Sequence, residues 1–436
     1  MAGAVMWFRR DLRLADNPAL LDALAAGDGH VLGLFVLDPA LWDPAGSPRQ
    51  NHLVASLRAL SDSMGGKLVI RRGDPAQVVP ELAEEIGAVS VHMAADYGPY
   101  GQRRDAAVEK VLGCPLVRTG SPYAVAPGRI LTQQGSPYQV FTPYFRAWLE
   151  HGWRGAVGTP ADVEWIGKRS DALPQTGVAA EGAGEKAARE HWQDYLDQIA
   201  AYDAERNRPD LDSTSRMSAP LKYGEIHPRT MLADLARLRS AGAEAYRREL
   251  AWREFCADLL LRNPEAAWKP LRAEFEKMEY DEPGEAFDAW CKGMTGYPIV
   301  DAGMRQLARS GFMHNRVRMV VASFLVKDLH IHWKHGARWF LRNLIDGDLA
   351  SNSLNWQWVA GCGADVAPYF RVFNPTTQGL KFDPTGAYVR RWIPELADLS
   401  GKSAHEPWNH DTDYPDPIVD HAEARLESLR RYNAIK

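Results

Sequence analysis

A run of hydroxyl-bearing residues lies near the middle of the chain, where Thr214–Ser218 reads T-S-R-M-S and precedes a stretch with helical spacing. Hydroxyls and backbone N–H groups at the start of a helix are suited to bind a pyrophosphate. The same residues would also serve as an ordinary helix cap, which satisfies the first N–H groups without a ligand. The run therefore marks either a phosphate site or a structural cap.

Positive charge gathers in the last third of the chain, although the formal net charge is −5. The stretch Gly311–Leu344 contains six Lys or Arg residues and one acid, Asp328. The stretch Val366–Trp392 adds four basic residues against Asp383 alone. Aromatic residues are interleaved with both, a pattern typical of a surface that contacts phosphates and stacks on bases. A solvated helix face would give the same charge pattern.

Two pairs of polar and apolar residues have helical spacing. Glu249 and Trp252 are three residues apart, and Asn315 and Met319 are four apart, so each pair shares one helix face. By residue type alone, Glu249 would more often be a surface acid and Met319 a core residue.

The elements that must position these residues differ along the chain. Strands are predicted in the first 120 residues, at Ala4–Phe8, Val31–Leu37, Lys67–Arg71, Val89–Ala94 and Leu116–Arg118, with helical patterns between them. This alternation indicates βαβ units and predicts an α/β fold with a doubly wound parallel sheet. No Gly-x-Gly-x-x-Gly follows a strand, which argues against ordinary dinucleotide binding.

Beyond the predicted sheet the pattern changes twice. Pro, Gly and Ser are frequent from about 121 to 190, which predicts a long surface connection. Helical spacing then dominates to the end, for example at Arg229–Ala241, Ala245–Leu261 and Asn315–His330. We expect an α/β domain at 1–125, an interdomain linker at 126–190 and an all-helical domain at 191–436.

The composition is that of a soluble protein of two or three domains, with 436 residues, 45% hydrophobic and 25% charged. A secretory signal and an apolar run of membrane-spanning length are both missing from the sequence, so we expect a cytoplasmic protein without a membrane partner. The four cysteines are far apart and predict reduced thiols, with no zinc or other metal site.

Several strings are specific enough to compare with a known family. They are Trp7–Asn17 (WFRRDLRLADN), Glu249–Phe255 (ELAWREF), Thr295–Leu307 (TGYPIVDAGMRQL), Phe312–Met319 (FMHNRVRM), Ile345–Asn352 (IDGDLASN), Asn355–Trp358 (NWQW) and Arg371–Gly379 (RVFNPTTQG). In this order and spacing the chain resembles the photolyase/cryptochrome family, and within it the class I cyclobutane-pyrimidine-dimer photolyases. The resemblance implies an α/β antenna domain joined to a helical FAD- and DNA-binding domain.

The resemblance implies a binding site for FAD in its reduced form, FADH⁻. The residues assigned to the FAD phosphates and their surroundings are Tyr202, Thr214, Ser215, Arg216, Met217, Ser218 and Arg253. Arg318, Asp346 and Asp348 would surround the isoalloxazine, where a cation stabilises the reduced, anionic flavin. Asn352 would face flavin N5. Without the resemblance, the arginine and the two acids would be a structural ion-pair cluster.

The implied reaction is that of a deoxyribodipyrimidine photo-lyase, a carbon–carbon lyase. A cyclobutane pyrimidine dimer is flipped out of UV-damaged DNA, and an electron from light-excited FADH⁻ splits its ring and then returns. The residues expected to form the lesion pocket are Glu249, Trp252, Asn315, Met319 and Trp358, and Asn352, at flavin N5, is expected to be catalytic with them. Glu249 would hydrogen-bond the thymine edge, and the two tryptophans would form walls. Phosphates beside the lesion would contact Arg206, Arg316, Arg371 and Lys381.

Members of the family reduce a resting flavin through three aromatic residues, normally all tryptophan. Trp356 and Trp333 fit the proximal and middle positions, but the outermost position falls on Tyr280. A tyrosine must lose its phenolic proton to pass a hole onward stably. Trp290, ten residues on, is the alternative end of the chain.

A second, antenna chromophore is expected on the α/β domain. The string Asp96–Asp105 (DYGPYGQRRD) resembles members that bind a deazaflavin or flavin antenna more than members that bind folate. Gly101 stands where folate binders carry an acid. A surface loop that enters a helix would explain the same residues.

Three other functions compete with this prediction. A (6-4) photolyase would carry paired histidines near the lesion, whereas only His314 is present here. A cryptochrome, which signals and does not repair, commonly has a long regulatory tail, but this sequence stops soon after its last helical run. A flavoprotein that only binds single-stranded DNA would not need Glu249 beside Trp252. We therefore expect UV-damaged DNA as the partner of a monomeric protein.

Overall fold

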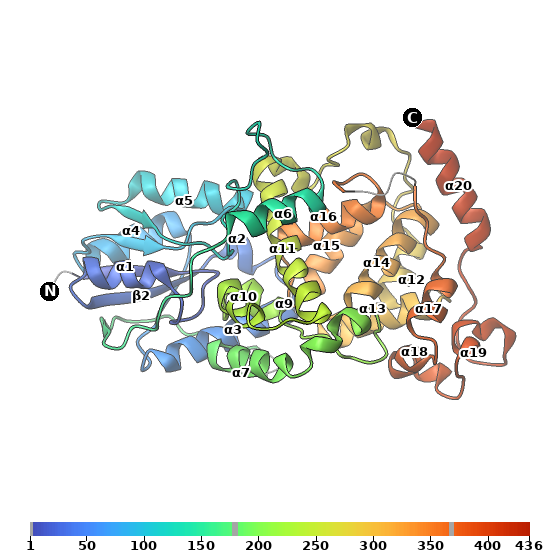
Figure 1. The fold of residues 1–436 in the computed structure, drawn as a ribbon, viewed down its shortest axis with the longest axis horizontal. Coiled ribbons are helices and arrows are strands. Elements are labelled where there is room, and N and C mark those ends of the chain that lie inside the picture. Colours follow the sequence, from blue (N-terminus) through green and yellow to red (C-terminus); the bar gives the residue numbers. More distant parts are fainter. Residues whose placement is uncertain (1–2, 177–181, 366–369) are drawn as a thin grey trace. The chain divides into compact units, whose positions relative to one another are not determined.

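The computed structural model describes residues 3–176, 182–365 and 370–436 (Figure 1). The chain forms two compact units. The first consists of Met1–Ala200 and Ser215–Pro264, and the second of Ala201–Thr214 and Glu265–Lys436. The domain boundaries expected from the sequence, at 125 and 190, stay a prediction, and residues 177–181 of the expected linker lie outside the described residues.

The first unit contains the predicted doubly wound parallel sheet, which is confirmed. Its strand order is β3-β2-β1-β4-β5, and every adjacent pair is parallel. These strands are β1 (Ala4–Phe8), β2 (His30–Leu37), β3 (Val69–Arg72), β4 (Val91–Met93) and β5 (Leu116–Arg118). The first two are buried along nearly their whole length, because helices on both faces of a parallel sheet require continuous apolar runs.

Helices follow the strands of the sheet, as predicted. They are α1 (Pro18–Ala26), α2 (Pro39–Trp42), α3 (Ser47–Ser63), α4 (Pro75–Glu85) and α5 (Pro99–Val111). Local chemistry fixes their starts. Asn17, Asp38 and Asp74 each accept a backbone N–H from the first turn, and a proline occupies the first helical position.

The expectation of a surface connection over residues 121–190 is wrong for part of that stretch. Helix α6 (Phe141–His151) lies within it and packs on α11 (Ala241–Arg262), and Trp148 is fully buried. Phe141, Tyr144, Phe145 and Trp148 repeat at helical spacing, so the signal for an amphipathic helix was present. A short strand, β6 (Glu164–Trp165), also pairs with the start of β2.

Further helices of the first unit are α7 (Glu185–Leu196), α9 (Ser218–Tyr223), α10 (Pro228–Leu235) and α11, and a 3-10 turn at Ile199–Ala201 spans the boundary after Ala200. The predicted helix Arg229–Ala241 ends early, because Ser240 adopts an extended conformation and caps α11. A buried hydrogen bond and a buried ion pair tie this helical region to the Trp7–Asn17 string. Arg13 donates to the Gly224 carbonyl at 3.0 Å, and Arg229 pairs with Asp16 at 3.1 Å.

The second unit is helical, as predicted. Its α-helices are α8 (Tyr202–Glu205), α12 (Glu285–Lys292), α13 (Pro298–Ser310), α14 (Asn315–Ser323), α15 (Trp333–Asn343), α16 (Leu349–Ala360), α17 (Pro375–Phe382), α18 (Ala387–Trp392), α19 (Lys402–His405) and α20 (His421–Ala434). The predicted helix Asn315–His330 changes at Ser323 into a π-helical turn, Phe324–Asp328, in which the Leu329 N–H bonds to the Phe324 carbonyl.

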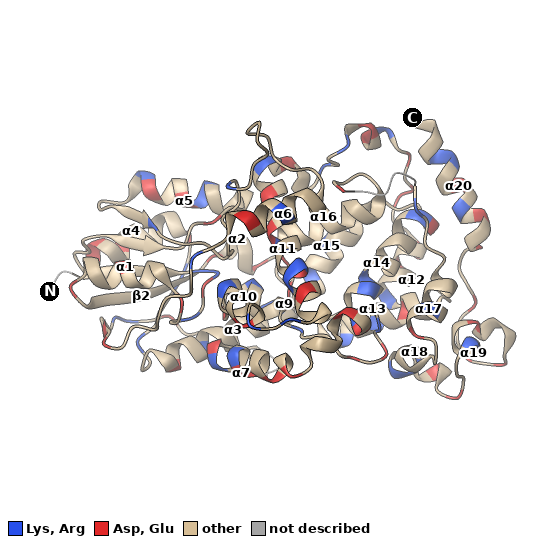
Figure 2. Ribbon diagram, in the orientation of Figure 1, with Lys and Arg blue, Asp and Glu red and all other residues tan. Residues whose placement is uncertain are grey.

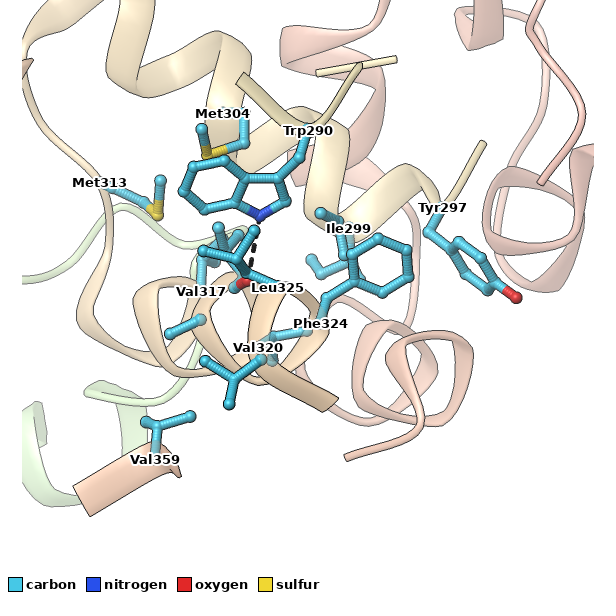
Figure 3. Packing of buried hydrophobic residues seen from close by; sticks show 14 of the residues in the cluster. Trp290, Tyr297, Ile299, Met304, Met313, Val317, Val320, Phe324, Leu325 and Val359 are labelled. Atoms are coloured by element: carbon cyan, nitrogen blue, oxygen red, sulfur yellow. Dashed lines mark hydrogen bonds between the residues drawn. The ribbon is translucent and has the colours of Figure 1, made fainter. Parts of the chain in front are cut away.

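The core of the second unit surrounds Trp290, which is fully buried (Figure 3). Its indole Nε1 donates to the Val321 carbonyl at 3.1 Å, so the buried N–H is satisfied. Met304 on α13 and Val317 on α14 lie around the ring (Figure 3). All four cysteines are free, as expected. Within the described ranges, no helix combines the length and the apolar character needed to span a membrane.

Candidate active site and nucleic-acid interface

The hydroxyl run divides between the two units, and its members have different surroundings. In the first unit, Ser215 bonds to the Tyr246 hydroxyl at 2.7 Å and accepts the Met217 N–H at 3.3 Å. Helix α9 begins at Ser218 directly afterwards, so Ser215 fixes the turn that leads into this helix. In the second unit, the Thr214 hydroxyl is buried and has no hydrogen-bond partner, which makes it a group that a bound ligand could satisfy.

Arg253 on α11 has clear protein partners in the first unit. Its guanidinium donates to the carbonyl groups of Pro122 at 2.9 Å and Leu221 at 3.1 Å, and lies 4.5 Å from the Tyr123 ring centroid. This side chain therefore joins α11 to two neighbouring segments. Its expected position near the FAD phosphates stays a prediction.

An acid–arginine pair in the second unit forms the strongest candidate for the flavin edge. Arg318 on α14 pairs with Asp346 at 2.9 Å and donates to the Met313 carbonyl at 2.7 Å. The other carboxylate oxygen of Asp346, Oδ1, is buried without a hydrogen-bond partner. A buried acceptor of this kind needs a donor, and the isoalloxazine ring carries an N–H at its edge. The pair thus fits FAD better than a purely structural ion pair.

Asp348 and Asn352 lie at the start of α16, next to that pair in sequence. Asp348 caps the helix by accepting the Ser351 N–H at 3.0 Å. Asn352 follows one turn later, and its amide nitrogen donates to the Ala337 carbonyl of α15 at 3.0 Å. This bond fixes the amide, and the expected position of Asn352 at flavin N5 stays a prediction.

The predicted lesion residues of the first unit are Glu249 and Trp252, both partly exposed on α11. Phe141 of α6 stacks on Trp252 with a centroid distance of 3.7 Å and an angle of 9°. The stack holds the indole plane and suits a rigid pocket wall. Sequence reasoning missed Phe141, because no local pattern links positions 111 residues apart.

The other three predicted lesion residues belong to the second unit. Asn315 is the exposed first residue of α14, Met319 is partly buried one turn later, and Trp358 is partly exposed on α16, which packs on α14. The Trp358 indole donates to the Asp365 carbonyl at 3.0 Å. Each predicted pair does share a helix, but convergence of all five residues on one cavity stays a prediction.

The predicted phosphate contacts are brought together in the second unit as a phosphate patch, defined as Arg206, Arg316, Arg371 and Lys381. Arg316 and Lys381 both lie over the Phe382 ring, at 4.4 and 5.2 Å from its centroid. Burial lowers the pKa of Arg316, and the neighbouring Arg206 and Arg371 lower it further. Like charges this close repel one another, and a bound anion would relieve that repulsion.

The patch is a local feature, because basic and acidic residues are interspersed over the ribbon as a whole (Figure 2). Arg316 donates from Nε and a terminal nitrogen to the neutral Asn207 amide oxygen, at 3.1 and 2.7 Å. Its guanidinium is thereby oriented without being neutralised. Sequence reasoning did not select Phe382, although it directly follows Lys381. Its ring packs under the two cations.

The three residues predicted to carry electrons all belong to the second unit. Trp356 and Trp333 are 2% and 1% exposed, and Tyr280 is partly exposed. A Cβ at Gly336 would lie 2.1 Å from Cη2 of Trp356, so only glycine lets this indole rest on α15. Tyr280 packs on His332 at a centroid distance of 4.5 Å, and His332 lies 5.7 Å from Trp333.

Trp290, the alternative end of the chain, has different surroundings. Its ring lies 6.3 Å from that of Trp356, with no exposed surface. Burial raises the pKa of Tyr280, so its phenol is neutral until it is oxidised. Tyr280 is partly exposed, whereas Trp290 is fully buried.

The predicted antenna region lies at the carboxyl ends of β1 and β4, where the strand order of the sheet reverses. Ligands of open parallel sheets bind in such crevices. Arg9 pairs with Asp105 at 2.5 Å, and Arg104 bridges Asp105 at 2.8 Å and Asp96 at 3.2 Å. A Cβ at Gly101 would lie 2.2 Å from the Asp96 carboxylate, so this glycine makes room for Asp96. We call these four charged residues the sheet-edge network.

Comparison with known proteins matches the α/β part and the helical part of the chain to two family models. Residues 4–163 match the family model for DNA photolyase, and residues 246–434 match the model for the FAD binding domain of DNA photolyase. The chain is 43% identical to the deoxyribodipyrimidine photo-lyase of Streptomyces griseus, over 99% of both chains. A parallel sheet followed by a helical FAD-binding region defines the class of protein. The chain belongs to the DNA photolyase family.

Solved structures share the whole architecture. A bacterial class III photolyase from Agrobacterium tumefaciens has a TM-score of 0.93 and 39% identity, covering 100% of this chain and 98% of that one. A cryptochrome from Synechocystis has a TM-score of 0.91 and 28% identity, over 99% of both chains. An archaeal photolyase from Sulfolobus tokodaii, with two FAD molecules, has a TM-score of 0.86 and 28% identity, over 99% of both. The fold alone therefore does not separate repair from signalling.

Proposed function

We propose that this chain is a deoxyribodipyrimidine photo-lyase, which uses light and bound FAD to split cyclobutane pyrimidine dimers in DNA. The observation that carries the proposal is the 43% identity, over 99% of both chains, to a relative of that name. The phosphate patch and the unsatisfied Asp346 oxygen supply the binding chemistry that the activity needs. The protein would work in the cytoplasm as a monomer.

In this proposal, FAD is held by Thr214, Arg318, Asp346, Asp348 and Asn352. When bound and reduced, it supplies the light-driven electron that splits the dimer. The buried hydroxyl of Thr214 would donate to a phosphate group, and Asp346 Oδ1 would accept an N–H of the ring, since neither atom has a hydrogen-bond partner within the protein. Arg318 lies against Asp346 and brings a positive charge to the part of the site where the reduced ring is negative.

The lesion would be held by Glu249, Trp252, Asn315, Met319 and Trp358. A flipped pyrimidine dimer has apolar ring faces and polar edges, so it needs flat walls and a few hydrogen-bonding groups. Trp252, stiffened by Phe141, and Trp358, held through its indole N–H, provide the walls. Glu249 accepts a thymine N–H and excludes ligands that lack this donor.

The class within the family and the antenna are also proposals. The motif strings favour class I, and the similarity to a class III photolyase makes that class the alternative. A flavin or deazaflavin antenna is favoured by Gly101, which leaves no carboxylate at that position for a folate-type contact. The second FAD of the similar archaeal photolyase supports a flavin-type antenna in the family.

For photoreduction we propose the order Trp356, Trp333, Tyr280. The support is the partial exposure of Tyr280 and its contact with His332, which borders Trp333. Trp290 borders Trp356 and is sealed in the core, which suits a structural role.

Two alternatives remain as outcomes of the test. A cryptochrome is favoured by the TM-score of 0.91 to one such protein. The (6-4) photolyase is disfavoured because His314 serves as a helix cap, accepting the Arg316 N–H at 3.2 Å. Burial lowers its pKa to about 4, aided by Arg318 and Arg316, so this histidine is neutral near pH 7.

The test is illumination of FAD-loaded, chemically reduced protein with an oligonucleotide that contains one thymine dimer. We expect the ultraviolet absorbance of the pyrimidines to recover in light and to stay unchanged in the dark. Glu249→Ala should lower the repair yield while the flavin spectrum is retained. Failure of the parent protein to repair the dimer would exclude the photolyase, and repair of a (6-4) lesion instead would support that rival.

A further inference from the structure

Lys327 is a buried lysine, 2% exposed, in the π-helical turn that continues α14. Its ammonium group donates to the carbonyl oxygen of Arg371 and lies 4.3 Å from the centroid of the Phe370 ring. Burial of a lysine is costly unless its charge is compensated, and π turns are frequent at functional sites. An apolar residue would fill this position at lower cost, so the amine calls for an explanation.

The segment held by Lys327 is residues 370–374, which form no helix or strand before α17 begins. A second bond supports it: the Phe373 N–H donates to the Ser323 hydroxyl at 3.3 Å. Asn374 then caps α17 by accepting the Thr377 N–H. Lys327 and Ser323 thus anchor the backbone that carries Arg371 of the phosphate patch.

The groups around Lys327 shift its pKa, so a change in nearby charge changes its protonation. The pKa of Lys327 is lowered to about 7, mainly by burial and in smaller part by Arg371, while Cys362 and Asp328 oppose the change. Asp328 is itself bound by His421, at 2.5 Å. An anion that arrives at Arg371 offsets the nearest positive charge, which favours the ammonium form of Lys327.

We propose that Lys327 is a positioning residue for DNA binding: its ammonium group holds residues 370–374 in place and takes up a proton from solvent when a DNA phosphate binds to the patch. This inference rests on the proposed function, which supplies DNA as the anion. According to this inference, a proton is taken up when DNA binds, and Arg371 is anchored by Lys327, a residue outside the patch.

The sign of the pH effect follows from the two states. DNA raises the pKa of Lys327 from its value in the free protein, so binding is tightest below about pH 7 and weakens as pH rises through the bound-state pKa. Each unit by which binding raises this pKa changes Kd by about tenfold over the full pH range.

The experiment measures Kd of the full-length protein for a fluorescent thymine-dimer oligonucleotide at constant ionic strength between about pH 6 and pH 9. For the parent we expect Kd to increase about tenfold across this range. Calorimetry in two buffers with different ionisation enthalpies should show proton uptake on binding. Lys327→Met should bind about tenfold more weakly at the acidic end, with a flat profile and little proton uptake.

Three further variants separate anchoring from titration. Lys292→Met removes an exposed lysine on α12 and should behave as the parent. Ser323→Ala removes only the second anchor, so it should weaken binding and keep the pH slope. In an Arg371→Ala background, Lys327→Met should weaken binding less than about twofold, because both residues act through one contact.

A flat profile for the parent, or an unchanged slope in Lys327→Met, would overturn the inference. Additive losses in the double variant would mean that Lys327 does not act through Arg371. Thermal unfolding shows whether Lys327→Met is folded, and Ser323→Ala tests the anchor if it is not. Absence of light-driven repair would refute the proposed photolyase activity and leave the pH dependence of binding as a separate result.

Discussion

The arginines of the sheet-edge network and those of the phosphate patch have opposite surroundings. In the network, Arg9 and Arg104 are nearly buried and meet the carboxylates of Asp96 and Asp105. In the patch, Arg316 has Arg206, Arg371 and a neutral amide for neighbours. The first group is satisfied within the fold, whereas Arg316 of the second group is repelled by like charges, which an external anion would offset. A cluster of charged residues is therefore not by itself a sign of a binding surface. What matters is whether other groups of the protein neutralise its charge.

The largest effect is expected from the network. Asp105→Asn leaves two buried guanidinium groups poorly compensated, which should destabilise the first unit by about 3 kcal/mol. Denaturant unfolding followed by circular dichroism measures it. Glu109→Gln, which removes the partner of Arg118 in an exposed pair, is the matched control and should have little effect. Unchanged stability, or a clear loss of DNA affinity, would remove the distinction between the two regions.

The patch should show the reverse behaviour. Arg316→Ala with Arg371→Ala should weaken DNA binding by about ten- to a hundredfold and lower the salt dependence of log Kd by roughly one per arginine. Stability should hold or rise slightly, since repulsion is removed. Fluorescence polarisation over a salt series gives both numbers. A salt slope equal to that of the parent would show that these residues do not contact phosphate.

A similar contrast separates Tyr280 from Trp290. Tyr280→Phe keeps the ring but removes the proton that must leave on oxidation, so photoreduction should slow severalfold. Trp290→Phe should mainly lower stability, by about 1–3 kcal/mol, because it leaves a cavity and removes the indole hydrogen bond to the Val321 carbonyl. Transient absorption and thermal unfolding measure the two effects, and repair by chemically reduced protein should survive both changes. If photoreduction is slowed more by Trp290→Phe than by Tyr280→Phe, then Trp290 and not Tyr280 ends the electron-transfer chain.

The smallest effect is expected at His314, because its pKa depends on the positive charge of the phosphate patch. Burial lowers its pKa to about 4, and Arg318 and Arg316 contribute. Because its folded pKa lies below the unfolded value, the protein loses stability as pH falls from about 6.5 toward 4. Arg316→Ala should raise this pKa by a few tenths of a unit. Proton NMR titration of the histidine ring measures the shift, and a constant pKa would place the patch charge elsewhere.

Much of the fold was predictable because its signals are local. Apolar runs separated by helical patterns gave the parallel sheet, and Asn17, Asp38 and Asp74 cap the helices that follow. Helix α6 was missed in a stretch rich in Pro, Gly and Ser, although its apolar spacing was visible. The π turn after Ser323 was not predictable, since tertiary packing and not propensity decides such insertions.

For the site, the sequence by itself determined which residues are the candidates for the chemistry. Residue type and spacing, with the family resemblance, selected Glu249, Trp252, Arg318 and Asp346, and the basic residues later found in the patch. Helical spacing also fixed which of them share a face, because the period of an α-helix is a local property.

Only the tertiary structure decided what each side chain contacts. Phe141 behind Trp252, Phe382 under two cations, and the carbonyl of Arg371 above Lys327 are contacts between distant positions. Burial of Trp290 and partial exposure of Tyr280 likewise depend on packing of the whole second unit. The reason is physical: burial and charge compensation are sums over neighbours in space, and no local stretch of sequence specifies those neighbours.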